Sequence, residues 1–76
     1  NEETFDIKIF PNPTSDIFQI ILPQEDNNFE KILFDQTGRI LLKTNENQID
    51  LSNFSAGYFF LQIPQVSQKL WKILKN

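Results

Sequence analysis

The stretch KILFDQTGRILLK, residues 31–43, decides the fold class. It consists of two short apolar segments separated by a polar turn sequence. Asp35 suits the first position of a type I turn, and Gly38 can adopt the positive φ needed where such a turn ends. Apolar residues that recur on both sides of a tight turn are typical of two antiparallel strands. The stretch therefore predicts a β-hairpin between Lys31 and Lys43.

Apolar residues alternate with polar ones in short segments along the rest of the chain. Turn residues separate these segments about every ten residues, which is typical of all-β proteins. Pro11, Pro13, Pro23 and Pro64 end strands, because proline cannot donate a hydrogen bond to a neighbouring strand. We predict strands at residues 5–9, 18–22, 29–35, 39–44, 49–51, 58–63 and 68–75. Strands of this number and spacing predict a β-sandwich.

The alternation within each predicted strand also indicates which side chains face the core. The predicted core residues are Phe5, Ile7, Ile9, Phe18, Ile20, Leu22, Ile32, Phe34, Ile40, Leu42, Phe59, Leu61, Ile63, Trp71 and Ile73. A second set of large apolar residues lies out of phase with these, namely Phe10, Ile21, Leu33, Leu41, Tyr58 and Phe60. A small sandwich cannot bury both faces of both sheets, so we expect some of the second set to be exposed.

The last predicted strand, residues 68–75, has a helical alternative. Leu70, Ile73 and Leu74 also fit the spacing of one face of a helix. The segment is shorter than the roughly 12 residues at which isolated helices become viable, and this favours a strand.

Composition limits the chemistry open to a single domain of 76 residues. The sequence has no His and no Cys, so the commonest general base and all thiol chemistry are missing. Glu25 and Asp26 lack the ligand spacing of a calcium loop. We therefore predict no enzymatic activity, no metal site and no cofactor. A net charge of −3 argues against binding to nucleic acid.

The sequence predicts neither a membrane span nor a signal peptide, and its first residue indicates a piece of a longer protein. No apolar run approaches the roughly 18 residues of a membrane span, and no signal peptide opens the sequence. The chain begins with Asn1 instead of Met, which indicates a fragment. Residues 1–4 are polar and predict the end of a linker, and residues 5–76 form the domain.

Pro11, Asn12 and Pro13 form the most distinctive short segment. Two prolines around an Asn predict a stiff corner at which the chain crosses from one sheet to the other. The Asn side chain is free to bond backbone groups there. Such a corner is compatible with a role in recognition as well.

The C-terminal segment 69–75 concentrates Lys69, Lys72 and Lys75 around Trp71. Lysines on an edge strand protect against sheet-to-sheet aggregation, which is one interpretation of this pattern. The other is a basic and apolar docking strip for a partner, consistent with the out-of-phase apolar groups on most strands.

Four segments carry a resemblance to a known family. They are FPNPT at 10–14, LFDQTGR at 33–39, IDLSNFSAGYF at 49–59 and KILK at 72–75. Each segment is weak alone, but their order, their spacing and the length of the chain are specific. Together they resemble the C-terminal sorting domain of the type IX secretion system, type A. The resemblance extends from about Ile7 to Lys75, which is nearly the whole chain.

The resemblance implies a fold and a function. The implied fold is an all-β, seven-stranded immunoglobulin-like antiparallel β-sandwich. The implied function is a non-enzymatic sorting signal that takes a larger cargo protein through the periplasm of a Gram-negative, Bacteroidetes-type bacterium to the cell surface or the medium. The implied partners are an outer-membrane shuttle protein of β-barrel type and a sortase that removes the domain.

The matched motifs, together with the basic tail, give the candidate partner-binding residues. They are Pro11, Asn12, Pro13, Asp35, Gly38, Gly57, Phe59, Lys69, Trp71, Lys72 and Lys75. We expect the last strand to pair edge to edge with a partner, and an exposed apolar face or the same edge to allow a homodimer. A different class of function stays open: an accessory carbohydrate-binding or adhesion module, in which Tyr58, Phe60 and Trp71 stack on sugars.

Overall fold

The predicted hairpin is present in the computed structural model, which describes residues 7–22 and 28–76. Strands β3 (Lys31–Asp35) and β4 (Ile40–Thr44) pair antiparallel. The Gly38 N–H donates to the Asp35 carbonyl at 3.0 Å, and Gly38 has a φ of 93°. The turn therefore has the geometry for which the sequence selects glycine.

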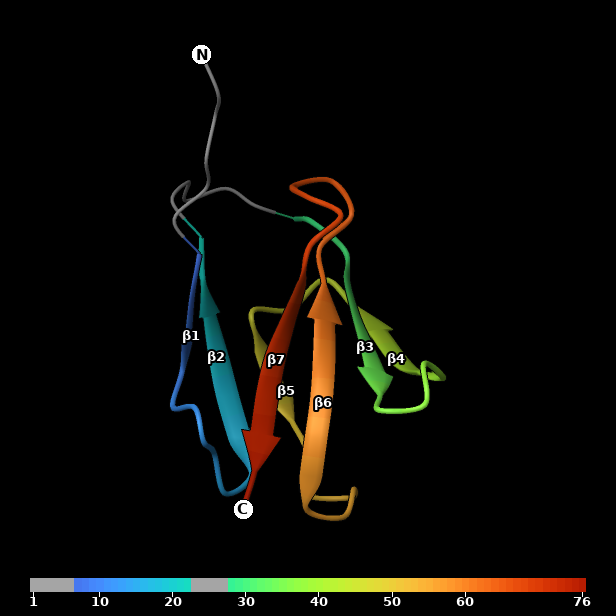
Figure 1. Cartoon of the computed structure of the whole chain (residues 1–76). Helices are drawn as coiled ribbons and strands as arrows, with labels where there is room; N and C mark the ends of the chain where they lie inside the picture. The colour runs from blue at the N-terminus through green and yellow to red at the C-terminus, as the bar shows by residue number, and fades with distance from the viewer. Residues whose placement is uncertain (1–6, 23–27) are drawn as a thin grey trace.

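The described residues form seven strands in two antiparallel sheets that face each other (Figure 1). The other strands are β1 (Lys8–Phe10), β2 (Ile17–Ile21), β5 (Gln48–Asp50), β6 (Gly57–Gln62) and β7 (Leu70–Lys75). One sheet has the order β1-β2-β5 and the other β4-β3-β6-β7. This division of strands is that of an immunoglobulin-like sandwich whose fourth strand lies beside the third. The predicted fold class is confirmed.

The hydrophobic core lies between the two sheets and is formed by large apolar side chains from β2, β3, β5, β6 and β7 and from residues next to these strands. Its buried members are Phe18, Ile20, Leu22, Leu33, Ile49, Leu51, Phe59, Leu61, Ile63 and Ile73. Alternation predicted the inward faces of β2, β6 and β7. Trp71 is half-buried and packs on the edge of this cluster.

The predicted inward face of β3 is wrong. Lys31 and Leu33 point into the sandwich, while Ile32 and Phe34 lie half-buried on the outer face. The pairing of Leu33 with Leu61 sets this register, since Leu61 is itself fully buried. A shift of one residue turns every side chain of a strand to the opposite face, and apolar residues at both phases left the sequence ambiguous.

The predicted inward face of β4 is wrong at Ile40, which is exposed. The pairing of β3 with β4 shifts register between Leu33 and Phe34. Such a bulge interrupts the alternation, so Leu41 and Leu42 both lie half-buried against the core.

Of the out-of-phase apolar residues, three are exposed as expected, and they are Phe10, Ile21 and Tyr58. Leu41 and Phe60 are half-buried, and Leu33 is part of the core. The helical alternative for residues 68–75 is wrong, because β7 pairs with β6 along its whole length. Within the described ranges, no helix has the length and apolarity needed to cross a membrane. Phe5 and the linker predicted at residues 1–4 lie outside the described residues.

Candidate functional site

β7 is an edge strand of the four-stranded sheet. One side of it pairs with β6, from Gly57 opposite Lys75 to Gln62 opposite Leu70. On its other side, the backbone pairing within the described part of the chain is one isolated bridge, in which Thr14 runs parallel to Lys75. An edge strand presents backbone groups that a partner strand can bind.

The corner at Pro11 and Pro13 carries the chain from one sheet to the other, as predicted. Before the corner, β1 pairs with β2, and after it Thr14 bonds to the end of β7. The Thr14 N–H donates to the Leu74 carbonyl, and the Asn76 N–H donates to the Thr14 carbonyl, both at 2.9 Å. The peptide bonds preceding both prolines are cis.

Asn12 uses its side chain as a strand would use its backbone. Its Nδ2 donates to the Lys72 carbonyl at 3.0 Å, and its Oδ1 accepts from the Leu74 N–H at 3.0 Å. An amide side chain has the same donor and acceptor as a peptide group. The corner therefore covers the C-terminal half of the β7 edge from Lys72 to Asn76.

The ammonium groups of the two exposed lysines of the tail lie over aromatic rings on opposite faces of the sheet. The Lys69 ammonium is 5.4 Å from the centroid of the Trp71 ring, on the face that looks toward the core. The Lys72 ammonium is 4.8 Å from the centroid of the Tyr58 ring on the outer face. Both pairs have the geometry of cation–π contacts, which restrict the long side chains while leaving the charges in water.

Lys75, the third lysine of the tail, has a different environment. It is buried, and its Nζ donates to the carbonyl oxygens of Leu51, at 3.0 Å, and Phe54. The carboxylate of Asp16 lies 3.6 Å away. The ammonium thus connects the end of β7 to the loop between β5 and β6, and it is not part of the exposed basic surface.

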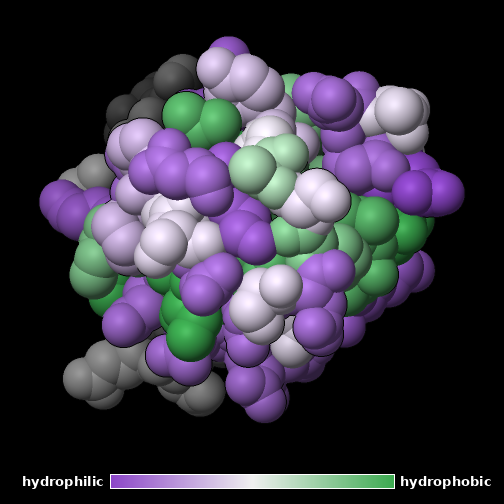
Figure 2. All heavy atoms as spheres, turned by 90° about the horizontal axis from the view of Figure 1, so that it is seen from below, coloured by the Kyte–Doolittle hydropathy of each residue, from purple (hydrophilic) through white to green (hydrophobic). Residues whose placement is uncertain are grey.

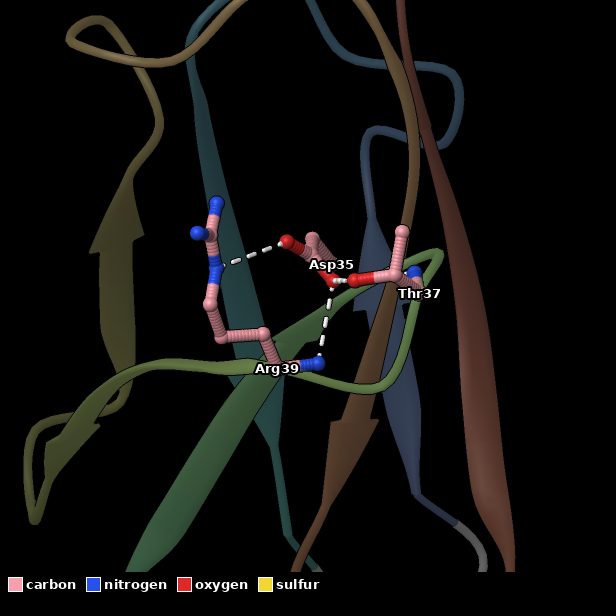
Figure 3. A network of polar contacts seen from close by, with 3 residues as sticks. All are labelled: Asp35, Thr37 and Arg39. Carbon is pink, nitrogen blue, oxygen red and sulfur yellow. Dashed lines mark hydrogen bonds and ion pairs between the residues drawn. The ribbon is translucent and has the colours of Figure 1, made fainter.

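The turn between β3 and β4 is held by one carboxylate (Figure 3). Oδ1 of Asp35 accepts hydrogen bonds from the Thr37 hydroxyl, the Thr37 N–H and the Arg39 N–H. Oδ2 is 3.2 Å from Nε of Arg39. The bonds from Thr37 and Arg39 stabilise the charged form, and they lower the pKa of Asp35 to about 2.

Gly57 and Phe59 lie at the start of β6, next to the end of β3 that carries Asp35. Gly57 has a φ of 144°, which disfavours residues with a side chain. Phe59 is buried, and its ring centroid is 5.9 Å from that of Phe54. Figure 2 shows this end from below: hydrophilic residues cover most of it, and a hydrophobic cluster reaches the surface on the right. Gly57 and Phe59 therefore have structural roles: Gly57 permits the backbone conformation at the start of β6, and Phe59 packs in the core.

The three aromatic residues considered for sugar binding do not form one platform. Tyr58 and Phe60 point to the outer face of the sheet, whereas Trp71 lies opposite the buried Leu61 and shares its face. In addition, lysines cover the rings of Tyr58 and Trp71. These three residues therefore do not provide the continuous aromatic surface that the carbohydrate-binding alternative requires.

The comparison with protein families decides what this arrangement belongs to. The family model described as "Secretion system C-terminal sorting domain" matches residues 8–75. The chain belongs to this family. The match covers every strand of the sorting domain, from the first residue of β1 to the last of β7. Comparisons with curated proteins and with solved structures return no match.

Membership defines the role of the sorting domain in broad terms. It is a C-terminal sorting signal of the type IX secretion system, a system of Bacteroidetes. The signal belongs to a protein that is exported across the outer membrane to the cell surface or beyond. Its function therefore involves contact with the secretion machinery.

The predicted site residues of the sorting domain fall into two spatial groups. Pro11, Asn12 and Pro13 lie beside β7, near Trp71 and Lys72, and Lys69 precedes that strand. The second group is the end formed by the hairpin turn and the start of β6, with Asp35, Gly38, Gly57 and Phe59. Lys75 is in the interior next to this end. A partner-binding role for any of these residues stays a prediction.

Sequence reasoning missed two buried polar residues, of which Thr14 belongs to the site and Lys31 to the interior of the sandwich. Thr14 is almost completely buried, and its hydroxyl donates to the Ile17 carbonyl at 2.8 Å. Lys31 is fully buried, its Nζ donates to the Asn45 carbonyl, and burial lowers its pKa. The position of Thr14 directly after the corner was the one available signal for the first. A lysine in phase with Leu33 was the signal for the second.

Proposed function

We propose that this chain is a folded, non-enzymatic export signal that directs a larger cargo protein across the outer membrane through the type IX secretion system. An outer-membrane shuttle protein receives the domain, and a sortase then separates it from the cargo. The cargo reaches the cell surface or the medium after passing through the periplasm. The family match over residues 8–75 supports this proposal.

The structural observation that carries the docking part of the proposal is the edge position of β7. The strand combines a partly open edge with two lysines held over aromatic rings. Backbone pairing at an edge provides affinity, and the flanking side chains provide specificity. Lys69, Trp71 and Lys72 are the residues that we assign to the partner, with the exposed corner at Pro11 and Pro13 beside them.

The remaining candidates stabilise the fold of the domain and are not part of this surface. Lys75 and Phe59 are buried, and Gly38 and Gly57 allow backbone conformations with positive φ. Asp35 organises the hairpin turn. Their motifs are therefore explained by the shape of the domain, and an effect on export is expected to act through folding.

The proposal is tested with the chain fused to the C-terminus of a secreted reporter. Lys69→Gln combined with Lys72→Gln removes the two exposed charges without touching the core. We expect the reporter to accumulate in the periplasm, as measured by fractionation of cells and medium. Lys43→Gln, an exposed lysine on the other edge strand β4, is the matched control and should leave export normal.

Two outcomes of this experiment contradict the proposal. Failure of the unmodified fusion to leave the periplasm would remove the assignment as a sorting signal. Normal export of the double variant would remove Lys69 and Lys72 from the docking surface. Deletion of the tail is a poorer test, because it also removes the buried Ile73.

A further inference from the structure

Only half of the outward edge of β7 is covered by the described part of the chain. In an antiparallel sheet, successive residues of an edge strand direct their backbone groups alternately toward the neighbouring strand and away from it. The bonds from Asn12 and Thr14 show that Lys72 and Leu74 direct theirs outward. By the same alternation, Leu70 does so as well.

The uncovered groups are few and adjacent. The Lys72 carbonyl and both backbone groups of Leu74 are bonded to the corner. Among the residues described, nothing bonds the N–H and carbonyl of Leu70 or the N–H of Lys72. Two donors and one acceptor thus remain along the N-terminal half of the edge. They are the groups that an additional strand uses.

The side chains around this open half are positively charged on both faces of the sheet. Lys69 lies on the core-facing side with Trp71, and Lys72 lies on the outer side with Tyr58. The chain as a whole has a net charge of −3, so the positive charge of this region is opposite in sign to that of the whole chain. Opposite charges on neighbouring strands attract each other, and like charges repel.

We propose that the open half of β7 binds an extended, acidic segment of the export machinery as an added strand. This inference rests on the proposed function and specifies the chemistry of its partner. Side chains of a strand alternate between faces, so carboxylates that reach both Lys69 and Lys72 must be an odd number of positions apart in the incoming segment. Backbone bonds to Leu70 and Lys72 fix the segment, and the two lysines select its charge pattern.

A second copy of this chain fits the same edge poorly. If two copies of β7 paired about a two-fold axis at the open half, Lys72 of each copy would lie near that of the other. Like charges at this distance are unfavourable in a sheet. The corner also stops such pairing at Lys72, since Asn12 already occupies the carbonyl of that residue.

The test uses the 76-residue chain and two synthetic peptides. Both peptides consist of Val and Thr with two Glu residues, placed an odd number of positions apart in one and an even number in the other. We expect the odd-spaced peptide to bind about twofold to fivefold more tightly, because it makes one more exposed ion pair. Amide chemical shifts of Leu70 and Lys72 should change on binding, and those of Leu74 should not. Lys69→Gln with Lys72→Gln should abolish the preference, whereas Lys43→Gln should retain it.

The inference is overturned by equal affinity for the two peptides, by binding at another edge, or by no shift change at millimolar peptide. A reporter that is exported while the peptide fails to bind would refute this inference and leave the sorting function intact. A reporter that stays in the periplasm while the odd-spaced peptide binds would refute the sorting function and leave the strand-binding edge. A dimer formed by the 76-residue chain through β7 would favour the second copy as occupant and count against the acidic segment.

Discussion

Two lysines of the same motif have opposite physical roles. Lys72 lies on the surface over Tyr58, while Lys75 is buried with its ammonium bonded to the carbonyls of Leu51 and Phe54. A buried ammonium is tolerated only where hydrogen bonds replace its water shell. Sequence spacing alone does not separate these cases, because the distinction depends on a loop far away in the sequence.

Substitution of Lys75 is expected to destabilise the domain strongly. Lys75→Met keeps the length of the side chain but removes the ammonium that donates to the carbonyls of Leu51 and Phe54. The Leu51 carbonyl keeps the bond from the Phe54 N–H, whereas the Phe54 carbonyl loses its donor. One acceptor left without a partner costs about 1–3 kcal/mol of unfolding free energy. Urea denaturation followed by tryptophan fluorescence of Trp71 measures the change. The exposed control Lys43→Met is expected to differ from the parent by less than about 0.5 kcal/mol. A Lys75→Met variant as stable as this control would contradict the role of the ammonium.

Asp35 gives the hairpin turn a pH dependence. Its pKa is lowered from 3.8 to about 2 in the folded chain by the bonds from Thr37 and Arg39. A carboxylate with a lowered pKa contributes stability above the pKa of the unfolded chain, and this contribution is lost as the pH falls toward the folded value. Asp35→Asn is therefore expected to be less stable than the parent at pH 7, with a difference that shrinks between about pH 4 and pH 2.

Urea midpoints measured across this pH range check the prediction for Asp35. Glu46→Gln is the matched control, because Glu46 is exposed and none of the described residues donates a hydrogen bond to its carboxylate. The control is expected to leave the difference between pH 7 and pH 2 as in the parent. A difference for Asp35→Asn that is the same at pH 7 and pH 2 would show that the turn does not depend on the charge.

At the scale of elements, the corner and β7 act as one unit. Asn12 is far from β7 in the sequence, yet it bonds both Lys72 and Leu74. Edge strands that carry such covers are protected from uncontrolled pairing. The corner therefore limits the length of β7 that a partner or a second copy can use.

Loss of the Asn12 amide should open the covered half of this edge. In Asn12→Ala the Leu74 N–H and the Lys72 carbonyl lose their partners, at an expected cost of about 1–2 kcal/mol. Hydrogen exchange should become faster at the Leu74 amide, while the Ile73 amide, which faces β6, stays protected. Asn53→Ala, in the exposed loop before β6, is the control. Unchanged exchange at Leu74 would contradict the covering role of Asn12.

The sequence predicted elements better than it predicted their faces. Period-two alternation and proline positions located the strands, and the corner crosses between sheets as expected. The faces of β3 and β4 were wrong because both phases of β3 are apolar and a bulge at Leu33 and Phe34 interrupts the alternation. Register across a sheet is a tertiary property, so it is not contained in the local pattern.

The candidate site was only partly predictable, again because tertiary packing is not contained in the local pattern. The segments were found from their motifs, but whether a motif residue is exposed depends on packing between distant parts of the chain. Lys69 and Lys72 are on the surface, whereas Phe59 and Lys75 are inside. The partner of Asn12 lies at the other end of the sequence. No local pattern indicates such a contact.

At the scale of the whole molecule, β7 is both a candidate docking element and a part of the core. It contributes the buried Ile73 and is the outer partner of β6. A domain of 76 residues has a small margin of stability, on the order of 5 kcal/mol. Removal of one large core side chain alone costs about 2–5 kcal/mol. A truncation of β7 therefore tests folding, whereas a substitution on its surface tests recognition.

The chain truncated before Leu70 is expected to be unfolded, because it lacks Ile73, the pairing along β6 and the Lys75 ammonium. Amide chemical-shift dispersion and a thermal melt followed by circular dichroism measure this. Lys69→Gln combined with Lys72→Gln, in the full chain, should keep the dispersion and unfold within about 0.5 kcal/mol of the parent, since surface substitutions rarely cost more. If the truncated chain melts cooperatively like the parent, β7 is dispensable for folding and is a free tail. Because an unfolded truncation and an intact but undocked domain both block export, only the double variant separates folding from recognition.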